Sequence, residues 1–169
     1  MKEIDTYTLE DRHVLIVGYL LSVLLSLELV LRMCLLRHNK RESEINILND
    51  IKECDEFPKN ALIEKNSLNE VIEKFNCQFK EMFEPVDPNR ITRIRNALGH
   101  GRILSKSFPM WIYNFEKIKE GEAGNKKDSG RVKVAFAEEM NVKWFNSNFI
   151  FLNAELVRVK KFFDSLPEN

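Results

Sequence analysis

Apolar residues crowd the first part of the chain in an uncharged run and then recur at helical spacing. Residues 14–27 carry no charge, and Glu28 and Arg32 follow four residues apart, on one face of a helix. We expect this first helix to run to about Arg37. Because it is apolar almost all round, we also expect other helices to enclose it.

Three further stretches have the spacing of amphipathic helices. Residues 43–54 carry apolar side chains at steps of three, which predicts a second helix. Ser67 followed by Glu70 is a capping-box pattern and predicts the start of a third. The apolar face of that third helix comprises Leu68, Val71, Ile72, Phe75, Phe79, Met82 and Phe83. A last amphipathic helix is predicted over residues 144–166.

A fourth helix is predicted from the dipeptide Asp87-Pro88. Aspartate caps helix N-termini, and proline is favoured at the first helical position. We expect this helix to cover residues 88–104. Its apolar residues form a narrow stripe at steps of three and four, the pattern used to pack against another helix. The stripe consists of Ile91, Ile94, Leu98 and Gly101.

The pattern changes over residues 108–137. The segment 110–115 is aromatic and β-branched, and 131–136 alternates between polar and apolar residues. A polar, charged, glycine-containing loop over 121–130 separates the two segments. Two such segments around a loop predict an antiparallel β-hairpin.

Together these elements predict one mainly α domain over residues 1–169. Its architecture is a bundle of four to five helices with a β-hairpin inserted before the C-terminal helix. The helical bundle is expected over 8–104, the hairpin insert over 108–137 and the C-terminal helix over 144–166. A chain of this length can bury a hydrophobic core as a single domain.

Composition restricts the partners of the chain. The 26 basic and 26 acidic residues balance, which argues against binding nucleic acid or membranes through global charge. The three cysteines are odd in number and lack a C-x-x-C spacing, so we expect reduced thiols in a cytoplasmic protein. The sequence predicts neither a metal site nor another cofactor.

The apolar run at residues 14–27 has two interpretations. Acidic residues outnumber basic ones before it, the opposite of a secretory signal. The run is also shorter than the roughly 20 residues that a membrane span needs. We therefore expect a core helix and no membrane contact, with a membrane-attached protein as the more distant alternative.

Positive charge is concentrated in the predicted fourth helix and the residues after it. No acidic residue occurs between Asp87 and Glu116. The same window contains His100 and a group of basic residues, Arg90, Arg93, Arg95, Arg102 and Lys106. A local basic patch on a neutral chain favours a phosphate-bearing partner. A solvated surface without specific ligands is the simpler interpretation of the flanking residues.

Helical geometry places the polar residues of this segment on two sides. At 100° per residue, Arg93, Asn96 and His100 lie on one side, opposite the apolar stripe. Arg95 and Arg102 lie together on a flank. To act on the same phosphate as His100, Arg95 must curl around the helix, or a second copy of the helix must complete the site.

The residue types suggest a reaction. Histidine can remove and return a proton near neutral pH, and arginine offers a charged fork of donors to phosphate oxygens. Together they suit RNA cleavage, in which a base activates the ribose 2′-OH and a guanidinium stabilises the charge that develops on phosphorus. Gly99 and Gly101 beside His100 predict the close approach of another backbone or a substrate.

The segment Arg95-Asn96-Ala97-Leu98-Gly99-His100 resembles the signature of the HEPN superfamily: an arginine, a polar residue and a histidine five positions on, near the end of a late helix. The order of the predicted elements is also similar. The resemblance implies a metal-independent endoribonuclease, active as a homodimer whose two motifs meet. It implies that Arg95, His100 and Asn96 are catalytic, with Glu28 of the first helix as a weaker supporting residue.

The predicted function is therefore endoribonucleolytic cleavage by 2′-OH transesterification, as a toxin or phage-defence effector. The flanking basic residues are assigned to substrate binding: Arg90, Arg93, Arg102 and Lys106. The expected partners are RNA, a second copy bound through the motif helix, and a cognate antitoxin or regulator. The alternative is a catalytically inactive HEPN-like module that binds RNA, a nucleotide or a protein partner through the same basic groove.

Overall fold

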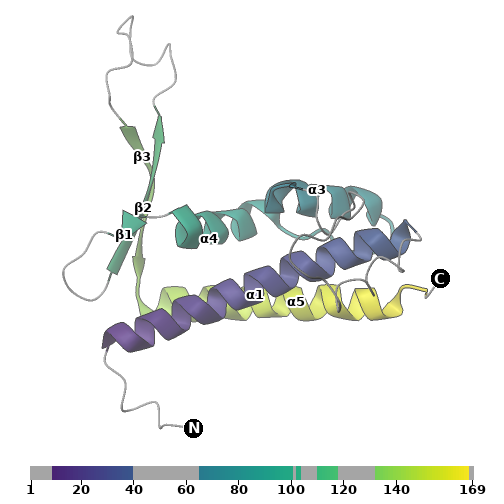
Figure 1. Ribbon diagram of the computed structural model, residues 1–169, viewed down its shortest axis with the longest axis horizontal. Coiled ribbons are helices and arrows are strands. Elements are labelled where there is room, and N and C mark those ends of the chain that lie inside the picture. Colours follow the sequence, from purple (N-terminus) through teal and green to yellow (C-terminus); the bar gives the residue numbers. More distant parts are fainter. Residues whose placement is uncertain (1–8, 40–64, 101, 104–109, 118–131, 168–169) are drawn as a thin grey trace, which may run out of the picture.

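A helical body with strands projecting from one end makes up the computed structural model (Figure 1). The structure describes residues 9–39, 65–100, 102–103, 110–117 and 132–167. The predicted second helix at 43–54 and the predicted loop at 121–130 lie outside these residues. The prediction of a mainly α fold with a β element before the last helix is confirmed.

The two longest helices, α1 (Leu9–His38) and α5 (Val142–Ser165), lie side by side and run in the same direction (Figure 1). Their carboxyl ends meet, because the Arg37 guanidinium donates from Nη1 to the Phe163 carbonyl oxygen at 3.0 Å and lies 3.9 Å from the centre of the Phe163 ring. Helix α5 begins two residues earlier than predicted, with Asn141 as its N-cap. This pair forms one layer of the body.

Helix α3 (Leu68–Gln78) begins at the predicted capping box. The Ser67 hydroxyl accepts from the Glu70 amide, and the Glu70 carboxylate accepts from the Ser67 amide at 2.6 Å. The helix ends at Gln78, earlier than its apolar pattern suggests, because the chain turns at Phe79. As a result Met82 is 64% exposed, and its predicted place on the buried face is wrong.

Helix α4 (Pro88–His100) begins as predicted. The Asp87 carboxylate accepts from the amides of Asn89 and Arg90 at 3.0 and 3.1 Å. The helix ends at His100 rather than at residue 104, because the chain pairs as strand β1 (Arg102–Ile103) directly afterwards. Arg102 therefore does not lie on the helix beside Arg95, and the predicted boundary is wrong.

The three described strands form one antiparallel sheet in the order β1-β2-β3. Strands β2 (Met110–Lys117) and β3 (Val132–Met140) are the predicted hairpin, with Met110 opposite Met140 at the end nearest the helices. Met140 is fully buried and Val142 already begins α5, so one cap residue separates sheet from helix. The base of the hairpin is thereby fixed to the helical core.

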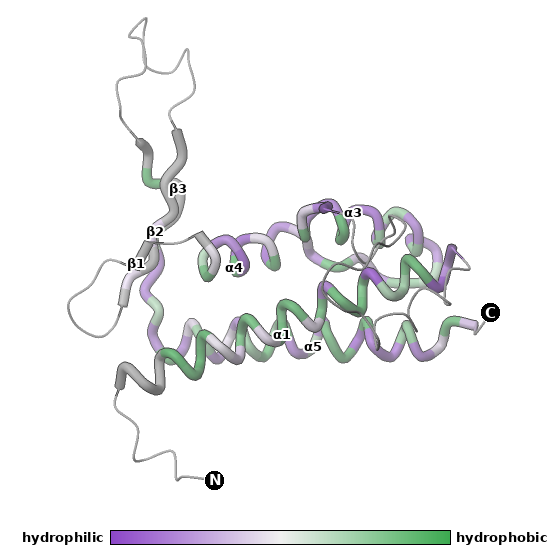
Figure 2. The backbone as a smooth tube through the Cα atoms, viewed as in Figure 1, coloured by the Kyte–Doolittle hydropathy of each residue, from purple (hydrophilic) through white to green (hydrophobic). Residues whose placement is uncertain are grey.

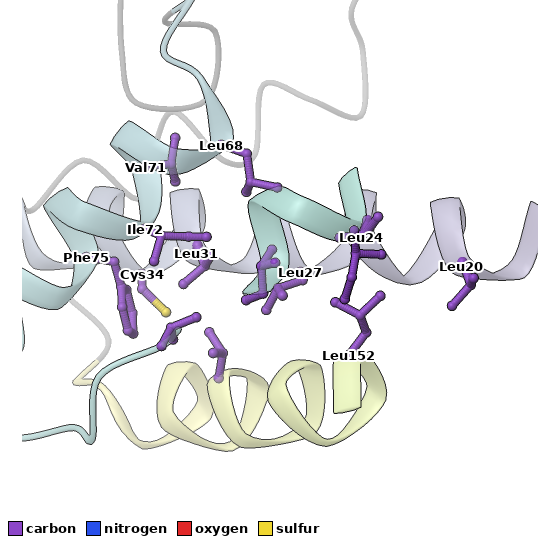
Figure 3. Close-up of a cluster of buried hydrophobic side chains, with 14 of the residues drawn as sticks. Leu20, Leu24, Leu27, Leu31, Cys34, Leu68, Val71, Ile72, Phe75 and Leu152 are labelled. Carbon is purple, nitrogen blue, oxygen red and sulfur yellow. The ribbon is translucent and has the colours of Figure 1, made fainter. Parts of the chain in front are cut away.

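The core lies between the α1–α5 layer and helices α3 and α4. Figure 3 shows leucines of α1 pointing toward Leu152 of α5 and toward the apolar face of α3. Ile91 and Ile94 of α4 are buried within the same core. Four phenylalanine rings fill its far end, with centroids 4.8 to 6.0 Å apart in edge-on or tilted contacts: Phe75, Phe79, Phe83 and Phe162.

Helix α1 is not enclosed on all sides, contrary to the prediction. It is apolar along most of its length (Figure 2), yet Val14, Tyr19 and Leu25 are each more than 60% exposed. Among the described residues, the helices that contact α1 are α3, α4 and α5, and they leave these side chains exposed. By length and composition α1 is long and apolar enough to cross a membrane, a property that core helices of soluble proteins share.

The cysteine environments give a testable prediction. Cys34 of α1 is fully buried in the core, and burial raises the pKa of its thiol from 9.0 to about 12. Cys77, by contrast, is exposed. The thiolate is the reactive form. At pH 8 we expect iodoacetamide to label Cys77 in the native protein and Cys34 only after unfolding, as followed by peptide mass spectrometry. Rapid native labelling of Cys34 would contradict the described core.

Candidate functional site

The polar side of α4 is directed away from the core. Ile91, Ile94 and Ala97 are buried, whereas Arg90, Arg93 and Arg95 are exposed and Asn96 is half-buried. The apolar stripe predicted to receive a second copy of this helix is therefore occupied, at Ile91 and Ile94, by the chain's own core. Among the residues that the structure describes, Arg93, Arg95 and Gly99 of α4 are exposed and so accessible to a partner.

Arg95 and Asn96 are brought together at the motif. The Arg95 guanidinium donates from Nη1 to the Asn96 carboxamide oxygen at 3.3 Å. Arg95 thus curls around the helix toward the side on which Arg93, Asn96 and the His100 backbone lie, as the candidate chemistry requires. The side chains of His100 and Arg102, and the whole of Lys106, lie outside the described residues.

The charge of Arg93 is neutralised by a residue distant in sequence. Glu138 of β3 forms an ion pair with the Arg93 guanidinium, and its other carboxylate oxygen accepts from the Trp144 indole N–H. The segment 88–115 lacks acidic residues in sequence, but in space it has this carboxylate beside it. The basic patch is consequently weaker than the sequence predicts.

Arg90 lies against an aromatic ring instead of an acid. Its guanidinium carbon is 3.8 Å from the centre of the Phe151 ring on α5, a cation–π contact. The side chain is nevertheless exposed, so one face of the guanidinium stays open to solvent. Arg90 can therefore still attract a phosphate, in a position fixed by the ring.

A cavity of about 210 Å³ lies between α4, β3 and α5. The residues that line it are Arg90, Arg93, Ile94, Glu138, Trp144 and Asn148. Two of the predicted substrate-binding residues thus share a cavity with an acid, an indole and an amide that were not predicted. The sequence carried one signal for Asn148: it interrupts the apolar series Trp144, Leu152 at helical spacing.

Asn148 is the least expected residue of this cavity. Only 8% of it is exposed, yet no hydrogen bond to its side chain occurs among the residues that the structure describes. Its polar atoms are not sealed from solvent, since among the described residues the buried side-chain atom without a hydrogen bond is Arg37 Nε, so the amide is reached through the cavity. Within residues 132–167, this is the polar side chain whose environment is least explained by the fold alone.

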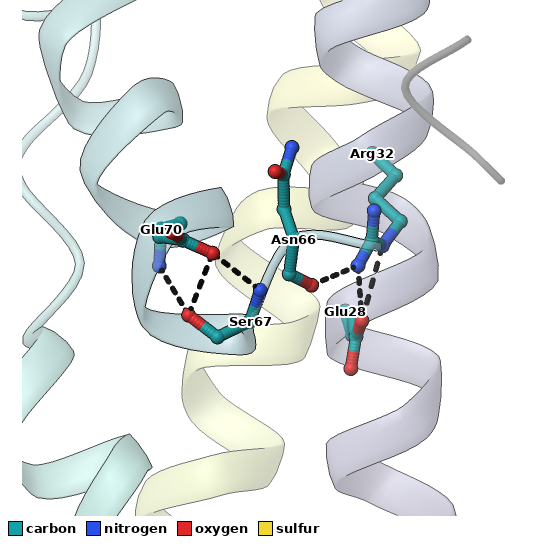
Figure 4. A network of polar contacts seen from close by, with 5 residues as sticks. All are labelled: Glu28, Arg32, Asn66, Ser67 and Glu70. Atoms are coloured by element: carbon teal, nitrogen blue, oxygen red, sulfur yellow. Dashed lines mark hydrogen bonds and ion pairs between the residues drawn. The ribbon is translucent and has the colours of Figure 1, made fainter. Parts of the chain in front are cut away.

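Glu28, the weaker candidate, is engaged elsewhere. Its carboxylate accepts from Nε and Nη2 of Arg32 at 3.0 and 2.6 Å. The same Nη2 donates to the Asn66 carbonyl oxygen at 3.0 Å, which ties α1 to the segment that begins α3 (Figure 4). Its described contacts neutralise the charge of Arg32 inside the bundle, and none of them is with α4.

Gly99 has open space where a side chain would be. A Cβ built at this position meets no atom of the chain within 4 Å. The close approach predicted from the glycine is therefore not made by the described part of this chain.

The described residues contain no group of three or more His, Cys, Asp or Glu side chains arranged to hold a metal ion. The chemically useful groups near α4 are instead guanidinium, amide, carboxylate and indole. These groups bind and orient polar ligands through hydrogen bonds.

In comparisons with known proteins, no protein-family model, curated protein or solved structure matches this chain. Two arrangements at α4 are the candidate functional sites. One is the Arg95–Asn96 pair on the polar side of the helix, and the other is the cavity one turn before it.

The contacts of Glu28 predict a structural phenotype. Glu28→Ala leaves the Arg32 guanidinium, which is 7% exposed, without its carboxylate partner, so we expect a loss of roughly 1–3 kcal/mol in the free energy of unfolding. Urea denaturation measures this. Glu81→Ala is the matched control, because its carboxylate is 83% exposed and should change stability by less than about 0.5 kcal/mol. Equal effects in both variants would refute the structural role.

Proposed function

We propose that this protein is a HEPN-like, metal-independent endoribonuclease that cleaves RNA by 2′-OH transesterification at a composite site in a homodimer. It acts in the cytoplasm, as a toxin or phage-defence effector with a cognate antitoxin or regulator as its expected partner. Arg95 and His100 are the catalytic residues of the proposal, and Asn96 orients them. These roles are the ones that the sequence resemblance implied.

The contact between Arg95 and Asn96 is the observation that carries the proposal. It brings a guanidinium onto the side of α4 where the backbone places His100, one turn beyond Asn96. The Asn96 amide uses its oxygen for Arg95 and keeps its N–H₂ group for a ligand or the imidazole.

The reaction needs a base, an acid and a stabilising cation. One imidazole accepts the proton of the 2′-OH, the 2′-oxygen attacks phosphorus, and the bond from phosphorus to the 5′-oxygen breaks. An imidazolium, supplied by the second copy, returns a proton to the 5′-oxygen. The Arg95 guanidinium binds the non-bridging oxygens as negative charge develops on them. The products are a 2′,3′-cyclic phosphate and a 5′-hydroxyl.

The burial of the apolar stripe of α4 leaves a different side of this helix for the second copy. Since Ile91 and Ile94 are buried in the chain's own core, the proposed dimer uses the polar side of α4 and the turn at Gly99. This contact brings the two motifs close together. It also gives the open space around Gly99 an occupant, the backbone of the partner copy.

The alternative function is binding without cleavage. The observation that favours it is the ion pair between Arg93 and Glu138, which removes one cation from the basic patch and is typical of a fixed, structural surface. In that case the basic groove beside Arg93 binds RNA, a nucleotide or a protein partner. Cleavage assays separate the two functions directly.

We expect the purified protein to cleave single-stranded RNA in the presence of EDTA and to leave the matching DNA intact, because DNA lacks the attacking hydroxyl. His100→Ala removes the proposed base and should lower the cleavage rate by about 10²–10⁴-fold. Arg95→Ala should lower it by about 10²–10³-fold. Gel electrophoresis of end-labelled RNA measures the rates, and periodate or phosphatase treatment identifies the cyclic phosphate.

His38→Ala is the control for these variants. His38 is exposed at the end of α1, next to Gln78, at the opposite end of the helical body from His100 (Figure 1). The His38→Ala variant should cleave RNA as the wild type does. If wild type and His100→Ala bind RNA equally and neither cleaves it, the binding function replaces the ribonuclease.

The open space at Gly99 allows a direct test of the dimer. Gly99→Leu should be tolerated by the single chain, with stability unchanged or raised by up to about 1 kcal/mol. It should nevertheless weaken the dimer and lower cleavage at least tenfold. Sedimentation equilibrium and the cleavage assay measure both effects. Gly18→Leu on α1, which also meets open space, is the matched control, and a fully active Gly99→Leu dimer would exclude this interface.

A further inference from the structure

We propose that the cavity between α4, β3 and α5 is a subsite that binds one guanine base of the RNA. Its lining comprises Arg90, Arg93, Ile94, Glu138, Trp144 and Asn148. The inference deepens the proposed function and rests on it in taking RNA as the ligand. The base recognition itself does not depend on whether the RNA is cut.

The size and charge of the cavity restrict the ligand. At about 210 Å³ it is smaller than the roughly 300–1,000 Å³ of sites for drug-sized molecules, so it suits one planar ring system. The Glu138 carboxylate repels a phosphate group inside it, and two guanidiniums repel a metal cation. With phosphate and metal cations excluded, the ligand that fits the cavity is neutral, polar and flat. A nucleobase has these properties.

Asn148 supplies the strongest indication that something binds there. It is 92% buried in a cavity lining, and no hydrogen bond to its amide occurs within the described ranges. Its polar atoms are accessible from the cavity, so a group placed there can bond to them. A ligand in the cavity would supply the partner, since the amide can both donate and accept.

The polar groups select guanine among the four bases. The Glu138 carboxylate is held in place from two sides, because one oxygen pairs with Arg93 and the other accepts from the Trp144 indole. Each oxygen keeps a free lone pair. Guanine alone presents two neighbouring donors, N1–H and N2–H₂, followed by the O6 acceptor. The carboxylate matches the donors, and the Asn148 N–H₂ group matches O6.

The walls of the cavity suit a flat ring. Ile94 is 4% exposed and contributes an apolar surface from α4, while the half-buried Trp144 contributes an aromatic one from α5. Single-stranded RNA is commonly recognised by unstacked bases that pack on aromatic side chains or guanidinium planes. Arg90 also lines the cavity and lies against the Phe151 ring. Its guanidinium offers a plane for the base to stack on or a contact to the phosphate of the same nucleotide.

The cavity also lies in the right place for a substrate contact. Arg93 at its edge is on the same side of α4 as Asn96 and the His100 backbone. Arg93 lies seven positions before His100 on the helix, which corresponds to a rise of about 10 Å along the helix axis. The bound base and the phosphate near His100 would therefore belong to nucleotides close together in one strand.

The test uses RNA that cannot be cut. We expect a 2′-O-methyl hexanucleotide with a single guanine to bind about tenfold more tightly than one with inosine in its place, because inosine lacks the N2 donor to Glu138. Adenine at this position should bind at least as weakly as inosine. Fluorescence anisotropy of the labelled oligonucleotides measures the dissociation constants.

Two variants assign the preference to the cavity. Asn148→Ala and Glu138→Gln should each weaken binding of the guanine oligonucleotide at least fivefold and remove most of the preference over inosine. Asn153→Ala, on an exposed position of the same helix, should bind as the wild type does. Asn148→Ala should also leave the melting temperature of the free protein nearly unchanged, because no described group of the chain is hydrogen-bonded to its side chain.

The outcomes distinguish this inference from the ribonuclease proposal. A wild type without a guanine preference, or a preference that survives both variants, overturns the subsite. A lower melting temperature of Asn148→Ala with unchanged binding assigns the residue to the fold and likewise overturns it. A guanine preference that depends on Asn148, in a protein that cleaves no RNA, supports the subsite and rejects the ribonuclease.

Discussion

Burial of one side of α4 fixes the orientation of the motif residues on this helix. Ile91, Ile94 and Ala97 pack into the core formed with α1 and α5, and this sets the rotation of the helix about its own axis. The same rotation turns Arg93, Arg95 and Asn96 outward. The cap at Asp87 sets where the helix begins, so the register of the motif follows from local and core interactions together.

Much of the fold could be predicted because its signals are local. The capping box at Ser67, the cap at Asp87 and the alternating segment before α5 each act within a few residues, and the structure confirms all three. The end of α4 could not be predicted in this way. It depends on Arg102 and Ile103 pairing with residues 112–113 of β2, a contact between distant parts of the chain.

The candidate site shows the same division. Arg95 and Asn96 were placed on different sides of the helix, and a direct hydrogen bond nevertheless joins these two neighbours. By contrast, Glu138 reaches Arg93 from 45 residues further along the chain, and no pattern within residues 87–116 contains that information. The exposure of α1 was missed for a related reason: apolar composition indicates that a side chain can be buried, but only packing decides which ones are.

The shared direction of α1 and α5 has an electrostatic consequence. Parallel neighbours place their macrodipoles in the same sense, so the partial negative charges of two carboxyl ends accumulate at one end of the body. Arg37 lies at this junction, in the last turn of α1, and binds the Phe163 carbonyl oxygen in the last turn of α5. Arg37 thus places a permanent cation where the two negative helix ends meet, far from α4.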